Sequence, residues 1–220
     1  MARVLVLVLV LIGAWSGNPA LAGAWPRGKG ETFLAVSAQI EGPNEFGFYS
    51  QFATFYLEYG LGPRLTGGLD LGGDGVQSSK AVAFLRWPLL GAEQPLKLAV
   101  AMGAGRIDGA TALRPEFSLG RGLRLAGWPG WANADARLAL FDSEPTLWEA
   151  EFTLGLSPTP KFKTILQLQT GGREGQSAYA RLAPSLVIRR KKGRYLEFGV
   201  TAGLQNAPDM GVKIGTWREF

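Results

Sequence analysis

The sequence contains neither cysteine nor histidine. Without cysteine, the chain cannot form disulfides, hold Cys-ligated zinc or iron–sulfur clusters, or use thiol chemistry. Without histidine, it lacks the most common general base and the commonest metal ligand. Charged residues are also few, at 19%, while 46% of residues are hydrophobic, which is unlike a disordered chain. We therefore expect an ordered protein with no cofactor and no metal site.

Long apolar runs are missing except near the N-terminus. Arg3 is followed by the apolar residues 4–12, a run that is too short for a transmembrane helix of ~20 residues. Small residues follow at Ala20-Leu21-Ala22, the pattern of a signal-peptide cleavage site. We predict a signal peptide over 1–22 and one exported domain over 23–220, the alternative being an N-terminal anchor helix.

Glycine is abundant, with 31 residues in 220, and the rest of the sequence alternates between apolar and polar residues. In 66–71, Leu69 and Leu71 share one face while Asp70 lies on the other; 148–154 repeats the pattern. This period of two is typical of β-strands with two different faces. The net charge of +5 is spread along the chain, so we expect no nucleic-acid partner.

Twelve such segments predict an all-β protein, a single antiparallel β-barrel of about twelve strands, with ten or fourteen as alternatives. An even number of strands places both termini on one side, predicted to be the periplasm. The predicted strands are 31–41, 48–62, 64–73, 79–89, 96–106, 111–122, 131–141, 146–157, 160–170, 177–189, 194–204 and 209–220.

Alternation alone does not say which face of a barrel points inward. A soluble barrel buries its apolar face, whereas a membrane barrel turns that face to lipid and keeps polar side chains in the lumen. The polar face carries seven acids and seven bases, which can pair inside a barrel. We predict that these charges line the lumen: Glu58, Asp70, Lys80, Arg86, Arg114, Glu116, Asp135, Arg137, Glu149, Glu151, Lys163, Arg181, Glu197 and Lys213.

Aromatic residues gather where the predicted strands meet turns. Amphipathic rings at such places suit the two interfaces between membrane and water. The predicted interface aromatics are Tyr59, Trp87, Trp131, Trp148, Tyr195 and Trp217.

The last predicted strand, 210–220, alternates and ends in Phe220. On this strand and on the pattern of the whole mature chain, the sequence resembles the outer-membrane β-barrel proteins of Gram-negative bacteria. The resemblance implies that Phe220 is an assembly signal read by the barrel-insertion machinery. It also implies contact with outer-membrane lipid and lipopolysaccharide. Arg218 departs from the outward apolar register, and we expect Trp217 to compensate for it near the interface.

Catalytic groups are not indicated. Glu149 and Glu151 share a strand face, as a glycosidase pair might be arranged, but ion pairing with Arg137 and Lys163 is favoured. A serine nucleophile would have no histidine to activate it. We therefore predict that the protein is not an enzyme.

The leading hypothesis is a narrow channel or transport barrel for small polar solutes. The alternatives are a non-conducting structural or envelope-assembly barrel and a soluble periplasmic β-barrel that binds an apolar ligand. No long constriction loop is predicted, so we expect a monomer.

Overall fold

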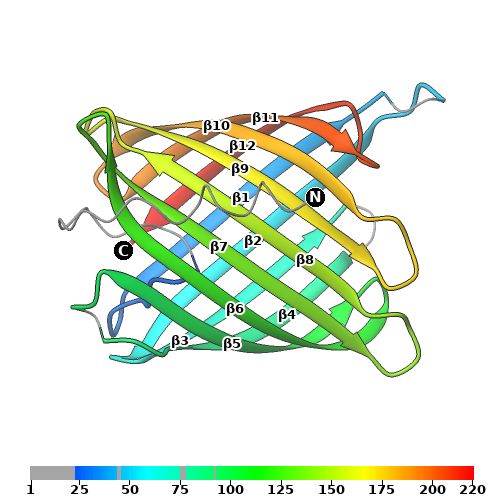
Figure 1. The fold of residues 1–220 in the computed structure, drawn as a ribbon, viewed down its shortest axis with the longest axis horizontal. Helices are drawn as coiled ribbons and strands as arrows, with labels where there is room; N and C mark the ends of the chain where they lie inside the picture. The colour runs from blue at the N-terminus through cyan, green and yellow to red at the C-terminus, as the bar shows by residue number, and fades with distance from the viewer. Residues whose placement is uncertain (1–22, 44–45, 75–77, 92) are drawn as a thin grey trace, which may run out of the picture.

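A computed structural model describes residues 23–43, 46–74, 78–91 and 93–220. The predicted signal peptide lies outside the described residues, which form twelve β-strands (Figure 1). The strands are β1 Thr32–Glu41, β2 Ser50–Gly62, β3 Leu65–Gly73, β4 Ser78–Pro88, β5 Leu96–Ile107, β6 Ala110–Leu125, β7 Trp128–Phe141, β8 Leu147–Leu156, β9 Phe162–Arg173, β10 Tyr179–Lys191, β11 Arg194–Gln205 and β12 Met210–Glu219.

Each strand pairs antiparallel with its neighbours in sequence, and β1 pairs with β12 to close the barrel. Closure satisfies the backbone hydrogen bonds of what would otherwise be two sheet edges. The prediction of a twelve-strand antiparallel barrel is therefore confirmed. No helix in the described residues is long and apolar enough to cross a membrane.

β6 and β7 are longer than the sequence predicted because a single two-residue turn connects them. β6 continues to Leu125 and β7 already begins at Trp128. Between them, Ala126 and Gly127 have φ angles of 50° and 84°. Successive positive φ values are typical of the type I′ hairpin turn, whose twist matches that of the flanking strands.

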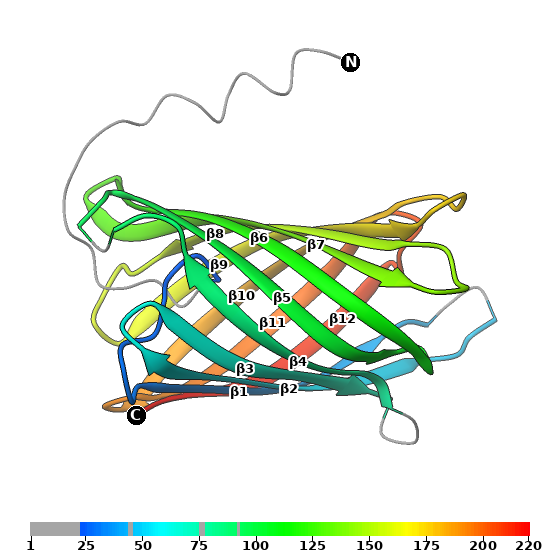
Figure 2. The same cartoon turned by 90° about the horizontal axis from the view of Figure 1, so that it is seen from below.

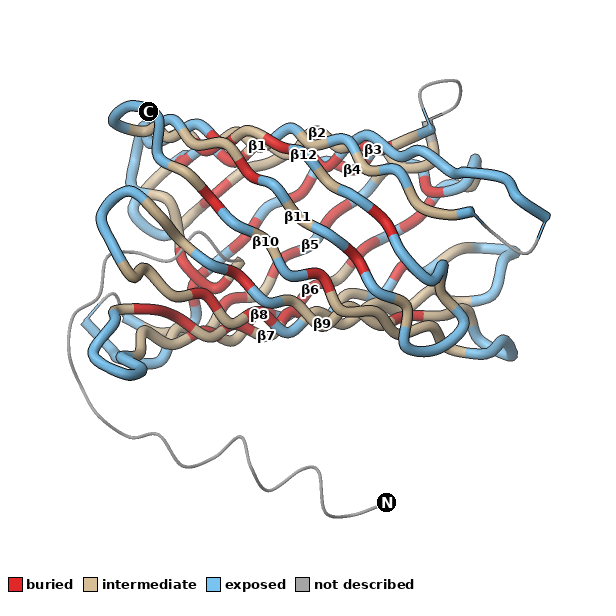
Figure 3. The backbone as a smooth tube through the Cα atoms, turned by 90° about the horizontal axis from the view of Figure 1, so that it is seen from above, coloured by how far each residue is buried: buried red, intermediate tan, exposed pale blue. Residues whose placement is uncertain are grey.

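The apolar face of the barrel points outward. Leu69 is 38% exposed, Phe152 51% and Phe198 45%, while inward positions on neighbouring strands hold buried charges. Figure 3 shows buried and exposed residues alternating along the strands. A barrel with an apolar exterior and a charged interior has the polarity of a membrane barrel.

The segment before β1 lies inside the barrel. Ala24 and Trp25 are buried and belong to an interior apolar cluster with Phe33, Trp131 and Trp217. Figure 2 shows this segment, in dark blue, folded back into the barrel at the end that holds the C-terminus. We call residues 23–27 the inner segment and this end of the barrel the terminal end.

Candidate functional site

The structure places all fourteen of the predicted lumen charges on the inward register of their strands. Half of them are buried, in keeping with the confined interior. The seven buried members are Glu58, Asp70, Arg86, Arg114, Glu116, Asp135 and Glu197.

A chain of alternating charges crosses the interior from the inner segment to β7. Arg27 Nε lies 2.6 Å from Glu58 Oε2, and Arg86 Nη1 donates to the other oxygen of Glu58. Arg86 Nη2 lies 2.7 Å from Glu116 Oε1, and Arg137 Nε lies 3.2 Å from Glu116 Oε2. Each buried carboxylate in this chain is held by two guanidinium groups, which offsets the cost of removing it from water.

Smaller charge groups lie around this chain. Asp70 is shared by Lys80 Nζ at 2.8 Å and Arg114 Nη1 at 2.6 Å. On the opposite wall, Lys213 Nζ lies 3.0 Å from Glu197 Oε1. Because acids and bases are interleaved, the lumen has no large region of one sign.

The predicted partners of three charges are wrong. Arg137 pairs with Glu116 and not with Glu149 or Glu151; within the described residues, neither of these two acids has a cation within 4.0 Å. Glu151 instead accepts hydrogen bonds from Gln167 Nε2 at 2.8 Å and Gln169 Nε2 at 3.1 Å.

Among the residues that the structure describes, Lys163 also does not form its predicted ion pair with Glu149 or Glu151. Its ammonium nitrogen lies 5.7 Å from the ring centroid of Trp131 and 5.1 Å from that of Tyr195. Aromatic rings stabilise a cation through their quadrupole, so in the lumen these two rings take the place of a carboxylate.

Three predicted interface aromatics face the lumen instead. Trp131 is 5% exposed and Trp217 is 9% exposed, and Trp217 Nε1 donates to Glu197 Oε2 at 3.0 Å. Tyr195 is the registered partner of Trp217 and faces the same way. The prediction used only their nearness to turns, whereas strand parity decides the face. Trp217 therefore cannot compensate for Arg218, which points outward.

The other three predicted interface aromatics lie on the outward register of their strands. Tyr59 is 45% exposed and Trp87 39%, and Trp148 is registered opposite Leu138, which is 44% exposed. Phe220 is 67% exposed, and its backbone N–H donates to Thr32 O at 3.0 Å across the closing seam.

Two charged residues that form ion pairs in the lumen were not predicted from the sequence. Arg181 Nη1 pairs at 2.5 Å with Glu41, at the far end of β1. Arg27 pairs with Glu58 from outside any strand. The alternating register of β1 would have placed Glu41 inward, but Arg27 belongs to a segment with no periodic pattern.

The inner segment narrows the lumen. A Cβ added to Gly120 of β6 would lie 2.2 Å from Trp25 Cζ3, so this glycine makes room for the indole. Beside the segment remains a cavity of about 220 Å³, lined by Gly23, Tyr56, Arg86, Asp135 and Glu151 among others. A mixed polar and aromatic cavity of this size suits water and small solutes. Within the part of the chain that the structure describes, no cluster of acidic side chains has the arrangement of a metal site.

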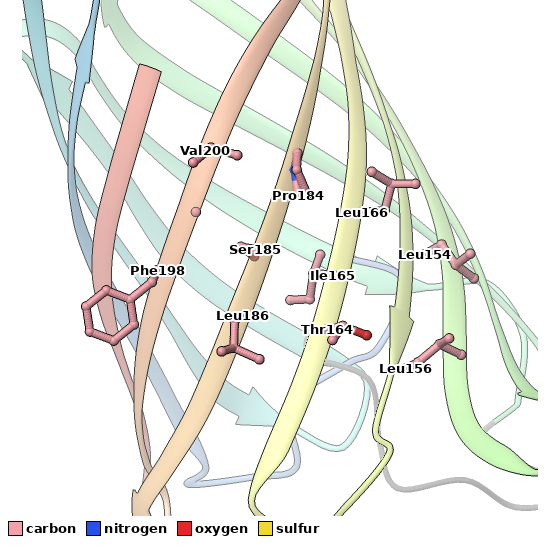
Figure 4. Close-up of a pocket in the computed structure, with 11 residues that line it drawn as sticks. Leu154, Leu156, Thr164, Ile165, Leu166, Pro184, Ser185, Leu186, Phe198 and Val200 are labelled. Atoms are coloured by element: carbon pink, nitrogen blue, oxygen red, sulfur yellow. The ribbon is translucent and has the colours of Figure 1, made fainter. Parts of the chain in front are cut away.

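A groove with a volume of about 620 Å³ lies on the outer wall over β8–β11. Figure 4 shows its side chains, among them Leu166, Leu186, Phe198 and Val200, around Pro184 of β10. Proline has no N–H to donate to a neighbouring strand, and the β10–β11 pairing is interrupted at Ala183 and Pro184, between the Leu182–Ala202 and Ser185–Gly199 pairs. The groove belongs to the apolar exterior and holds no charged side chain.

Three solved structures that share this fold are an outer-membrane channel and two porins. The COG4313 outer membrane channel from Pseudomonas putida F1 has 14% identity and a TM-score of 0.58, over 93% of this chain and 100% of that chain. A structure of KdgM porin has 5% identity and a TM-score of 0.62, over 86% and 99%. One of NanC porin has 7% identity and a TM-score of 0.61, over 85% and 100%. No protein-family model and no curated protein sequence matches the chain.

At these identities the likeness establishes the fold. The closed twelve-strand barrel and its apolar exterior together define an outer-membrane β-barrel protein. The resemblance drawn from the last strand and the alternating pattern is thereby confirmed at the level of this class.

Proposed function

We propose that this protein is a narrow outer-membrane channel for ions and small polar solutes, constricted at its terminal end by the inner segment. The observation that carries the proposal is the cavity beside Gly23 of the inner segment, which is lined by charges of both signs. Porins with sixteen to eighteen strands leave wide channels, and eight-stranded barrels are filled by side chains; twelve strands fall between these sizes.

Interleaved charges favour passage of both cations and anions. A ring of one sign would attract one kind of ion and repel the other, but the lumen alternates acids and bases along its walls. We therefore propose weak ion selectivity and a size limit set by the inner segment.

Single-channel recording in planar bilayers tests this function. The purified, folded protein should give small discrete current steps, and Trp25→Ala should give larger ones because it removes an indole from the constriction. Trp128→Ala is the matched control, since Trp128 is 46% exposed at a turn and should leave the step size unchanged. Absence of steps from both the native protein and Trp25→Ala, with folding shown by heat-modifiable gel mobility, would reject conduction.

A second candidate, a non-conducting structural barrel, has its own support. The series of ion pairs that runs from Arg27 to Arg137 spans the interior. The aromatic cluster of Trp25, Trp131 and Trp217 lies at the terminal end. The same recordings separate the two candidates. The soluble barrel for an apolar ligand is disfavoured, because such a barrel needs an apolar interior and the observed interior is charged.

We also propose residence in the outer membrane as a monomer, reached through removal of the predicted signal peptide. The apolar exterior would contact lipid and lipopolysaccharide, and Phe220 would present the assembly signal at the end of β12.

A further inference from the structure

Within the described residues, Asp135 of β7 is a buried carboxylate with no cation at ion-pair distance. It is 6% exposed, and it accepts hydrogen bonds from Ser118 Oγ at 2.6 Å and Asn133 Nδ2 at 2.5 Å. No lysine or arginine nitrogen of the described residues lies within 4.0 Å of it. Arg137, two residues along the same face, is engaged by Glu116. A buried charge without a counter-charge is costly, so Asp135 requires an explanation.

The charges around Asp135 leave this part of the lumen negative. Three cations line the cavity next to Asp135, namely Arg86, Arg137 and Lys213. Four carboxylates line the same cavity, those of Glu58, Asp135, Glu151 and Glu197, so the balance is one negative charge. An additional cation would therefore be stabilised here, even though Arg86 is close by.

Gly23 lies directly against this carboxylate. A Cβ placed on Gly23 would be 2.7 Å from Asp135 Oδ1 and 2.8 Å from Ser118 Oγ. With a Cα–Cβ bond of about 1.5 Å, the Cα of Gly23 is at most about 4.2 Å from that oxygen. The nitrogen of Gly23 is bonded to the same Cα and therefore lies at most about 5.7 Å from that oxygen. A free N-terminal residue can turn about its Cα–C bond, which would carry this nitrogen towards the position of the added Cβ, beside Asp135.

The neighbouring residues hold Gly23 in this position. Ala24 is 1% exposed and Trp25 occupies the space that Gly120 leaves. Two residues further, the backbone N–H of Arg27 donates to Thr66 Oγ1 at 3.1 Å. The inner segment is thus attached to the wall on both sides of Trp25.

Removal of the predicted signal peptide would change the chemistry at this point. Hydrolysis adds one water across the bond between Ala22 and Gly23: the leader leaves with a carboxylate on Ala22, and Gly23 gains an amine that takes up a proton. An uncharged amide with one N–H thus becomes an ammonium group with three N–H donors.

We propose that the α-ammonium group of mature Gly23 forms an ion pair with Asp135 inside the lumen. The pair can form only after the leader has been cleaved at this bond, so the processed N-terminus fastens the inner segment in the constriction. This inference rests on the predicted cleavage site and is independent of whether the lumen conducts.

Amine labelling of the protein purified from outer membranes tests the proposal. N-terminal sequencing should first give Gly23. A small amine-reactive reagent, read out by mass spectrometry of the N-terminal peptide, should then modify the native Gly23 amine at least tenfold more slowly than in Asp135→Asn. The control is Asp209→Asn, whose carboxylate is exposed between β11 and β12 and should leave the rate unchanged. A different N-terminal residue, or equal rates in the native protein and Asp135→Asn, would overturn the proposal.

A thermal-melting cycle keeps the proposal testable if Asp135→Asn folds poorly in the cell, because the chains can be refolded in detergent. An uncharged extension of four residues before Gly23 displaces the ammonium group. It should lower the melting midpoint of the native barrel and leave that of Asp135→Asn nearly unchanged. Equal losses in the two backgrounds would show a steric effect alone and would refute the ion pair.

Discussion

Arg86 of β4 and Glu116 of β6 are joined inside the barrel by an N–O contact of 2.7 Å, and both side chains are at most 4% exposed. They lie on strands that are not adjacent in the barrel, with β5 between them. The pair therefore connects two parts of the wall that backbone hydrogen bonds do not join directly. Because Arg86 also pairs with Glu58 of β2, this one guanidinium group links β2, β4 and β6 across the interior.

Replacing Arg86 should destabilise the barrel strongly. Arg86→Ala leaves Glu58 and Glu116 buried with fewer partners, a change that costs about 3–5 kcal/mol when a buried ion pair is broken. Urea unfolding in lipid vesicles measures the loss. Arg173→Ala is the matched control, because its partner Asp108 is 54% exposed and exposed pairs contribute ~0–1 kcal/mol. Similar midpoints for the two variants would contradict this assignment.

The space at Gly120 should control the constriction. Gly120→Ala places a methyl group 2.2 Å from Trp25 Cζ3, so the indole must move out of its site. We expect larger single-channel current steps than in the native protein. Gly122→Ala, on the same strand and with nothing within 4 Å of the added Cβ, should behave like the native channel. Identical steps in all three proteins would show that Trp25 does not limit the current.

Glu151 should bias the lumen toward cations. Its side chain lines the cavity. Within the described residues, its carboxylate accepts hydrogen bonds only from uncharged side chains. Glu151→Gln removes a negative charge and keeps the shape, so the reversal potential in a salt gradient should shift toward anion selectivity. Glu144→Gln, at an exposed turn position, should give a smaller shift. A shift toward cations would contradict the placement of Glu151 in the conducting path.

The C-terminal residue should matter for assembly. Phe220→Ala is expected to lower the fraction of protein that reaches the heat-modifiable, folded form in the outer membrane. Met210→Ala changes an exposed residue at the opposite end of the same strand and should assemble normally. Equal folded fractions would remove Phe220 as the signal.

The sequence was sufficient for the strands but not for the lumen contacts. Alternation in 148–154 gives the strand β8 and its two faces directly, because a period of two is a local property. The face of Trp217 follows from the same parity, yet its nearness to a turn suggested the interface. The ion-pair partner of Arg137 does not follow from strand parity. Glu116 and Glu149 lie on the two strands that flank β7, and only the three-dimensional position of the guanidinium group selects one of them.

The inner segment could not be predicted, for a physical reason. Residues 23–27 have no strand period, and their position depends on a space that Gly120 creates nearly a hundred residues later. A glycine in a strand signals a close approach but does not identify the group that approaches. β6 also ends later, and β7 begins earlier, than the sequence predicted. The two-residue turn at Ala126-Gly127 lacks the Asn-Gly or Asp-Gly pair that usually indicates a tight hairpin.

The outward orientation of the apolar face is the claim on which the account depends, and the absence of native cysteine makes it directly measurable. A fluorophore attached at Phe152→Cys or Phe198→Cys should be strongly quenched by brominated lipid acyl chains, while one attached at Ser37→Cys in the lumen should not. The reverse pattern, with quenching at Ser37→Cys and none at Phe152→Cys and Phe198→Cys, would contradict a membrane barrel with a charged interior.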